Sequence, residues 1–161
     1  MTLDDDVARL ARTRPFDLLP REALQLIAFS CEKRRLRAGE ALFFPGEAAD
    51  SGYFVHSGAI LLIEGGAEPK GERRAGAGAL IGESALYAPT ARLVSARAAE
   101  DAVVIRIPRE TFARVLKEFP AGARKIRAAL AVRTRLLVDG LEATRVNSLD
   151  RAGAPRSRAA R

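Results

Sequence analysis

The ends of the chain and its middle carry different spacings of hydrophobic residues. Near the N-terminus the apolar residues recur every three or four positions, at Ala23, Leu24, Ile27, Ala28 and Cys31. This spacing predicts a helix with one apolar face. We expect N-terminal helices within residues 1–33, and on that face the thiol of Cys31 is expected to be buried and structural.

The helical spacing returns after residue 108. The apolar positions there are Phe112, Val115, Leu116 and Phe119, followed by Ile126, Leu130 and Leu137. Pro120 breaks or restarts the helix because its ring cannot continue an existing turn, and Gly140 is suited to cap a helix end. We therefore expect C-terminal helices over residues 109–145.

Between these helical regions the chain consists of short apolar runs separated by glycine-containing turns. Ser57 and Gly58, for instance, separate two such runs. The pattern predicts strands over residues 34–37, 41–44, 52–57, 59–64, 72–75, 93–99 and 102–107.

Many short strands at this spacing are typical of an antiparallel barrel or jelly roll, in which closure protects the strand edges. We expect an α+β, mainly β fold: a β-roll over residues 34–108 with one short internal helix, flanked by the helical regions. Residues 146–161 contain few large apolar side chains and are expected to form a basic, flexible tail.

Composition and charge limit the classes of protein. Residues 1–120 are balanced in charge, and all of the net charge of +7 comes from residues 121–161. No aromatic residues interleave with these arginines, which favours a solvated tail over a nucleic-acid or membrane site. Cys31 is the only cysteine, no apolar run reaches the length of a membrane span, and the N-terminus is acidic. These features favour a cytoplasmic protein without disulfides.

Residues 82–95, which read Gly-Glu-Ser-Ala-Leu-Tyr-Ala-Pro-Thr-Ala-Arg-Leu-Val-Ser, carry the chemistry of a small anion site. Glu83 can accept a hydrogen bond from a hydroxyl group, and Arg92 can fork onto phosphate oxygens. Backbone amides at the start of the turn can complete the site. The alternative is a structural salt bridge between Glu83 and Arg92.

The order of the predicted elements, together with this stretch, resembles the cyclic nucleotide-binding domain family over roughly residues 15–140. The resemblance is strongest in three segments: residues 36–50, residues 53–60 with Gly58 at the turn, and residues 82–95, which are similar to the family's phosphate-binding cassette. It implies a β-roll that binds a cyclic nucleotide, with cyclic AMP favoured over cyclic GMP.

The resemblance also implies roles for individual residues of the cassette. Glu83 matches the acid that accepts the ribose 2′-hydroxyl, Arg92 the arginine that pairs with the cyclic phosphate, and Ser95 a hydroxyl that reaches the purine. The expected ligand-binding set is Gly82, Glu83, Ser84, Ala85, Arg92, Leu93, Val94 and Ser95. In this set Ser84, Leu93 and Val94 depart from the family pattern; at Leu93 and Val94 small residues are usual.

In a domain of this kind, ligand capture would move a hinge near Phe119 and Pro120 and reposition the helix that follows. Val132, Leu136 and Leu137 are the expected lid residues over the base. The partners would be the nucleotide and an unidentified protein effector. The alternative is a degenerate domain without a ligand, acting as a protein interaction or homodimerisation module through its C-terminal helix.

Other functional classes find less support. A DNA-binding winged helix would need several dozen residues after the long helix, more than residues 146–161 supply. His56 is the only histidine, so a histidine-clustered metal site is not expected, and packing or a surface position is expected for it. No nucleophile motif accompanies it. We therefore expect a binding protein without metal or catalysis.

Overall fold

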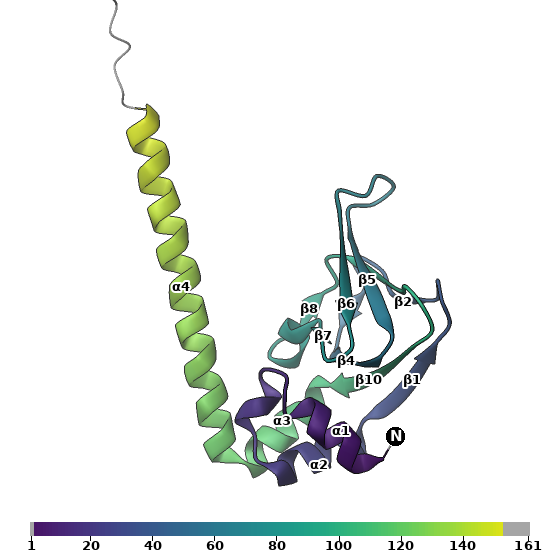
Figure 1. Cartoon of the computed structure of the whole chain (residues 1–161). Helices are drawn as coiled ribbons and strands as arrows, with labels where there is room; N and C mark the ends of the chain where they lie inside the picture. The colour runs from purple at the N-terminus through teal and green to yellow at the C-terminus, as the bar shows by residue number, and fades with distance from the viewer. Residues whose placement is uncertain (1, 153–161) are drawn as a thin grey trace, which may run out of the picture. The chain divides into compact units, whose positions relative to one another are not determined.

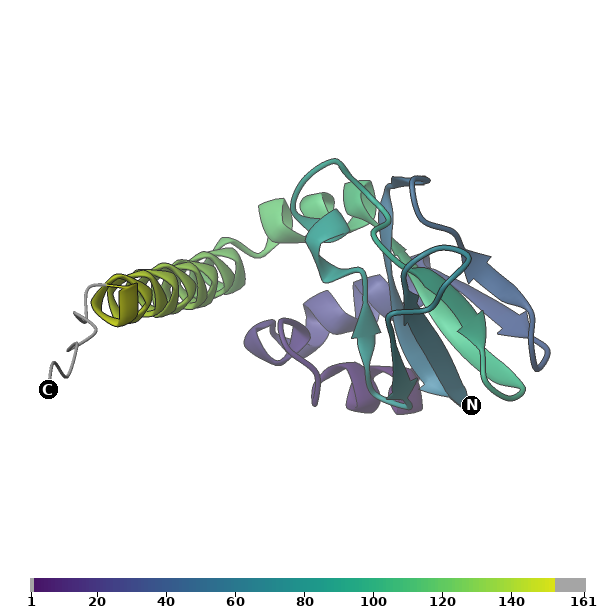
Figure 2. The same cartoon turned by 90° about the horizontal axis from the view of Figure 1, so that it is seen from above.

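The computed structural model describes the backbone of residues 2–152 and the side chains of residues 2–142 (Figures 1 and 2). The chain divides into two units, of which the first ends at Ala123 and the second begins at Arg124. The first unit contains the β-roll and the helices packed on it. The described residues of the second continue one long helix.

Three N-terminal helical segments precede the roll: α1 (Leu3–Leu10), the 3₁₀ helix η1 (Phe16–Leu18) and α2 (Arg21–Ser30). Thr2 caps α1 through a reciprocal pair of hydrogen bonds with Asp5. Such a capping box satisfies amides that have no acceptor within the helix. In Figure 1, α1 and α2 lie with α3 (Arg109–Glu118) at one end of the roll.

The chain turns from helix to strand at Cys31, which is the C-cap of α2. Because β1 starts at the next residue, Cys31 is half-buried rather than fully buried as expected. Loss of solvent at this position raises the pKa of the thiol to about 12. The thiol therefore stays protonated, and the structural role expected for it agrees with this environment.

Two four-stranded antiparallel sheets form the roll. The first has the order β1-β10-β4-β7, the second the order β2-β9-β5-β6, and β3 and β8 form a separate pair. The strands are β1 (Glu32–Leu36), β2 (Ala41–Phe43), β3 (Ala48–Ala49), β4 (Ser51–Ser57), β5 (Ala59–Glu64), β6 (Gly71–Gly76), β7 (Leu80–Ile81), β8 (Thr90–Ala91), β9 (Ser95–Ala98) and β10 (Ala102–Pro108).

This architecture confirms the expected fold class, and each of the seven predicted strands corresponds to a strand of the roll. The two-residue strands β3, β7 and β8 were not predicted, because two residues are too few to show an alternation of apolar and polar positions. The turn at Gly58 is confirmed. Its φ is +75°, and a Cβ atom there would collide with the carbonyl oxygen of Asp101.

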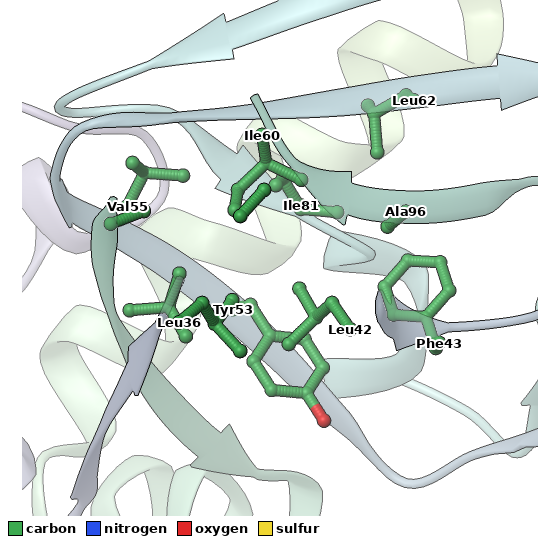
Figure 3. Packing of buried hydrophobic residues seen from close by; sticks show 12 residues of the cluster. Leu36, Leu42, Phe43, Tyr53, Val55, Ile60, Leu62, Ile81 and Ala96 are labelled. Atoms are coloured by element: carbon green, nitrogen blue, oxygen red, sulfur yellow. The ribbon is translucent and has the colours of Figure 1, made fainter. Parts of the chain in front are cut away.

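The core lies between the two main sheets, whose apolar side chains point toward one another (Figure 3). Tyr53 and Val55 of β4 face Ile60 and Leu62 of β5 across this interior. Leu42 and Phe43 are both buried although they are neighbours in β2. The register shift between Ala41 and Phe43 explains this, because a bulge breaks the alternation of a strand.

A polar cluster around the buried residues Asp6 and His56 joins α1 to the roll. Asp6 of α1 is 2% exposed, and its carboxylate lies 3.0 Å from Nε2 of His56 on β4 and also pairs with Lys33 of β1. Arg9 donates to the carbonyl oxygen of His56. Of the two environments expected for His56, the structure therefore shows packing in the interior. Within the described residues, no group of acidic, histidine and cysteine side chains could hold a metal ion.

The C-terminal helices differ from the prediction in where they end. α3 stops before Phe119, and α4 (Pro120–Ala152) starts at Pro120, as expected for a proline in the first turn. However, α4 continues through Gly140 to Ala152, so Gly140 does not cap the helix, and the backbone of residues 146–152, expected in the tail, is helical. A glycine inside a helix costs only about 1 kcal/mol and need not end it.

The remainder of the expected tail, residues 153–161, lies outside the described residues. Among the residues that the structure describes, no helix combines the length and apolar character needed to cross a membrane.

Candidate functional site

The segment from Gly82 to Arg92 consists of a glycine turn, a short 3₁₀ helix and a two-residue strand. Gly82 has φ of +70° and is followed by the 3₁₀ helix η2 (Glu83–Leu86). After η2 the chain enters β8, which pairs with β3. The backbone of Arg92 then exchanges hydrogen bonds with the turn before β3: its amide donates to Glu47, and its carbonyl oxygen accepts from Gly46. These bonds fix the position of the backbone from which the Arg92 side chain extends.

The guanidinium of Arg92 is turned into the roll and is only 7% exposed. Its Nη2 donates to the carbonyl oxygen of Ser51 at 2.7 Å. The carbon of the guanidinium lies 4.3 Å from the centre of the Phe43 ring and 5.4 Å from that of Tyr53. Cation–π contacts of this kind hold a cation without neutralising it.

Burial lowers the pKa of Arg92, and Tyr53, Asp50 and Glu47 offset this only in part. Within the part of the chain that the structure describes, no carboxylate lies at ion-pairing distance from this guanidinium. The structural salt bridge between Glu83 and Arg92, considered as an alternative, is therefore not formed. A buried cation without a counter-ion is costly, and a bound anion would relieve that cost.

A pocket of about 230 Å³ opens over this guanidinium. Five of the expected site residues line it: Gly82, Ser84, Arg92, Leu93 and Val94. The sequence did not indicate the remaining lining residues, which are Phe43, Ala49, Leu62, Arg73, Ile81, Thr90 and Ala91. Ile81, Thr90 and Ala91 adjoin or lie within residues 82–95. The other four come from strands distant in sequence, and only the closure of the roll brings them to the pocket.

Three of the expected site residues lie elsewhere. Oε1 of Glu83 accepts a hydrogen bond from the hydroxyl of Tyr87 at 3.0 Å. The amide of Ala85 donates to the carbonyl oxygen of Gly82, so it is engaged within η2. Ser95 pairs with Ile63 between β9 and β5. The roles expected for these residues stay predictions.

Leu93, which stands where the family usually has a small residue, lines the pocket with its side chain 86% exposed. It therefore lies at the mouth of the pocket and does not fill its interior. Val94 is partly buried and packs against the core of the roll. The departure from the family pattern at Leu93 thus changes the rim of the site more than its depth.

α3 contacts the cassette through two side chains. Nη1 of Arg109, the first residue of α3, lies 3.1 Å from each of the carbonyl oxygens of Ala49, Ala85 and Ala88. The ring of Tyr87 packs edge-on against Phe112, with 5.9 Å between the ring centres. The same helix therefore holds both the end of η2 and the residue that binds Glu83.

The expected lid residues belong to the second unit. Val132, Leu136 and Leu137 lie on α4 and are 59%, 67% and 63% exposed, respectively. Their role as a lid stays a prediction.

The roll thus carries a pocket with one buried arginine, Arg92, in its lining. The family model described as the cyclic nucleotide-binding domain matches residues 33–119. This match covers more than half of the chain, and the chain belongs to the cyclic nucleotide-binding domain family. The resemblance stated from the sequence is thereby confirmed.

The curated relatives match the chain over only part of their own length. Lysophospholipase NTE1 of Chaetomium globosum is 33% identical over 127 residues, which cover 76% of the chain but 8% of that protein. The cyclic AMP receptor protein of Thermus thermophilus is 31% identical over 112 residues, which cover 68% of the chain and 52% of that protein. The chain thus spans a small part of the first and about half of the second.

Solved structures show the same fold. A cyclic nucleotide-binding-like protein from Brucella abortus is 41% identical with a TM-score of 0.64, over 71% of this chain and 99% of that one. The N-terminal domain of a transcriptional regulator from Streptomyces coelicolor is 25% identical with a TM-score of 0.74, over 81% and 95% of the two chains. The domain is a regulatory, non-catalytic fold.

Proposed function

We propose that this protein senses a 3′,5′-cyclic nucleotide, which binds in the pocket over Arg92, and that it performs no catalysis of its own. The single observation that carries the proposal is the state of Arg92: it is buried, lines the pocket, and has no carboxylate partner among the described residues. A cyclic phosphodiester brings one negative charge and two free oxygens, which match one guanidinium.

The neighbouring residues support a phosphate at this position. Gly82 leaves its backbone open toward the guanidinium, and Ser84 lines the pocket at the start of η2. Glu83 lies between Gly82 and Ser84 in the sequence. Its carboxylate would accept the ribose 2′-hydroxyl after breaking its hydrogen bond with Tyr87. The name of the Thermus thermophilus relative refers to cyclic AMP, and resemblance alone favours that nucleotide over cyclic GMP.

Ligand capture would be transmitted through α3. Arg109 donates to carbonyl oxygens of β3, of η2 and of the turn after η2. A shift of the cassette would therefore also shift the start of α3. The chain after α3 continues through Phe119 and Pro120 into α4, which the ligand would reposition. The ligand changes this equilibrium only to the extent that it binds one arrangement better than the other.

Calorimetric titration with cyclic AMP and with cyclic GMP tests the proposal. We expect heat of binding with at least one nucleotide, and a loss of affinity equivalent to about 2–5 kcal/mol in Arg92→Ala. Arg97→Ala is the matched control, because Arg97 is an exposed arginine on β9 that does not line the pocket. Absence of binding at millimolar nucleotide, or equal binding by Arg92→Ala, would refute the proposal.

A second candidate function is self-association through α4. Leu136, Leu137, Val138 and Leu141 are all about half or more exposed, and Leu137 and Leu141 continue the stripe of Ile126 and Leu130 at helical spacing. We expect light scattering to show a dimer that Leu137→Glu dissociates. The control Ala128→Glu places the same charge on the opposite side of the helix. A monomer at tens of micromolar would contradict this function.

A further inference from the structure

Arg73 lines the pocket from a strand outside the cassette. It lies on β6, the edge strand of the second sheet, directly across from Leu62 of β5. Directly paired residues share one face of a sheet, and residues two apart on a strand do so as well. Leu62 is buried and lines the pocket, and Ala75 packs against the core. Arg73 therefore stands on the inner face, where it is itself a lining residue.

The charge of Arg73 is not neutralised by the protein. Its neighbour Arg74, on the opposite face, pairs with Glu100 at 2.9 Å. Arg73, in contrast, makes no ion pair with any residue that the structure describes. The residues that line the pocket include Arg73 and Arg92 but no aspartate or glutamate. Arg73 is exposed and lines the pocket, so its guanidinium remains available to a second part of the ligand after Arg92 has been matched to the single charge of a cyclic phosphate.

A guanidinium is satisfied best by two acceptors side by side. The N7 and O6 atoms of guanine provide such a pair, and the arginine–guanine fork is the commonest specific contact between arginine and a base. Adenine presents N7 as an acceptor but an amino group beside it, so one arm of the fork would meet a donor. The base edge of the ligand thus decides whether Arg73 is satisfied.

We propose that Arg73 is a specificity-determining residue that reads the N7 and O6 edge of guanine, so that the pocket prefers cyclic GMP to cyclic AMP. This inference rests on the proposed function and reverses the choice of nucleotide that resemblance alone suggests. A second phosphate could also offer paired acceptors. However, a pocket of about 230 Å³ lies below the roughly 300–1,000 Å³ of typical ligand pockets and suits one nucleotide rather than two.

Titration calorimetry with cyclic GMP, cyclic AMP and 5′-AMP separates these cases, using the wild type, Arg73→Ala, Arg73→Lys and Arg74→Ala. We expect the wild type to bind cyclic GMP at least about fivefold more tightly than cyclic AMP, the lower end for one bidentate pair. Arg73→Ala should bring the ratio close to one. Arg73→Lys should do nearly the same, because lysine keeps the charge but lacks the fork. Arg74→Ala should keep the wild-type ratio.

Several results would overturn the inference. If Arg73→Ala weakens both cyclic nucleotides by the same factor, Arg73 contributes charge alone. If 5′-AMP, a dianion with the other base, binds more tightly than cyclic GMP and loses that advantage in Arg73→Ala, Arg73 reads a phosphate. A wild type that binds both cyclic nucleotides equally refutes the inference and leaves the proposed function standing. A wild type that binds neither refutes both.

Discussion

Nη1 of Arg92 occupies the space where a side chain at Gly82 would begin. A Cβ atom built on Gly82 collides with this nitrogen, and the φ of +70° at Gly82 independently favours glycine. Gly82 and Arg92, at the two ends of the cassette, are therefore in contact, and this contact is possible because Gly82 has no side chain. This contact seats the guanidinium beneath the loop and against Ser51.

Replacing Gly82 with alanine should damage both the fold and the site. The left-handed conformation alone costs about 1–2 kcal/mol for alanine, and the new methyl group must also displace Arg92. Gly78→Ala is the matched control, because Gly78 has φ of +89° but open space around its Cβ position. Urea unfolding and nucleotide titration should show that both variants lose stability and that only Gly82→Ala loses affinity. Equal affinity losses would mean that the contact with Arg92 is unimportant.

Arg92→Met should abolish binding while changing the free energy of unfolding of the ligand-free protein by less than about 1 kcal/mol. Removing a buried cation without a counter-ion is favourable, whereas leaving the carbonyl oxygen of Ser51 without its donor costs about 1–3 kcal/mol, so the two effects oppose each other. Chemical denaturation without nucleotide measures the sum. A loss of 3–5 kcal/mol, as for a broken buried ion pair, would assign Arg92 a structural role instead.

Tyr87→Phe tests whether Glu83 must turn away from Tyr87 to bind the ligand. The variant removes the hydroxyl that donates to Oε1 of Glu83 but keeps the ring against Phe112. If one neutral-to-charged hydrogen bond opposes capture of the ribose, its removal should tighten cyclic nucleotide binding by about 1.5 kcal/mol, roughly tenfold. The gain should vanish with a 2′-deoxy cyclic nucleotide, which lacks the hydroxyl. Unchanged or weaker binding of the ribose form would contradict this role of Glu83.

The sequence predicted the roll because its signals are local. Glycine turns such as Gly58 and the period of apolar residues on either side are visible in short windows. The surroundings of Arg92 are not local: Ser51, Phe43 and Tyr53 come from β4 and β2, and only the packing of two sheets brings them to the guanidinium. The same is true of Arg73, whose polar strand shows no alternation that would assign it to the inner face.

Arg109→Ala should loosen the cassette more than the loss of a surface ion pair would. Arg109 supplies the donor shared by three carbonyl oxygens, one each from β3, from η2 and from the turn after η2. A hydrogen bond from a charged group contributes about 1.5–3 kcal/mol. Arg106→Ala is the control, because the pair of Arg106 with Asp50 is solvent-accessible and should contribute at most about 1 kcal/mol. Thermal unfolding compares the two variants. Equal destabilisation would show that Arg109 does not hold the cassette.

The buried pair of Asp6 and His56, flanked by the exposed Arg9 and Lys33, should make stability depend on pH. Burial lowers the pKa of His56 from its usual 6.5, with Arg9 and Lys33 acting in the same direction and Asp6 opposing. Since the folded state binds this proton less readily than the unfolded chain, stability is fully present above about pH 6.5. It falls as the pH drops through that value toward the lowered folded-state pKa. In urea unfolding between pH 5 and 8, His56→Gln should show a smaller loss on acidification than the wild type. A wild-type protein that gains stability relative to His56→Gln on acidification would mean that attraction to Asp6 outweighs burial.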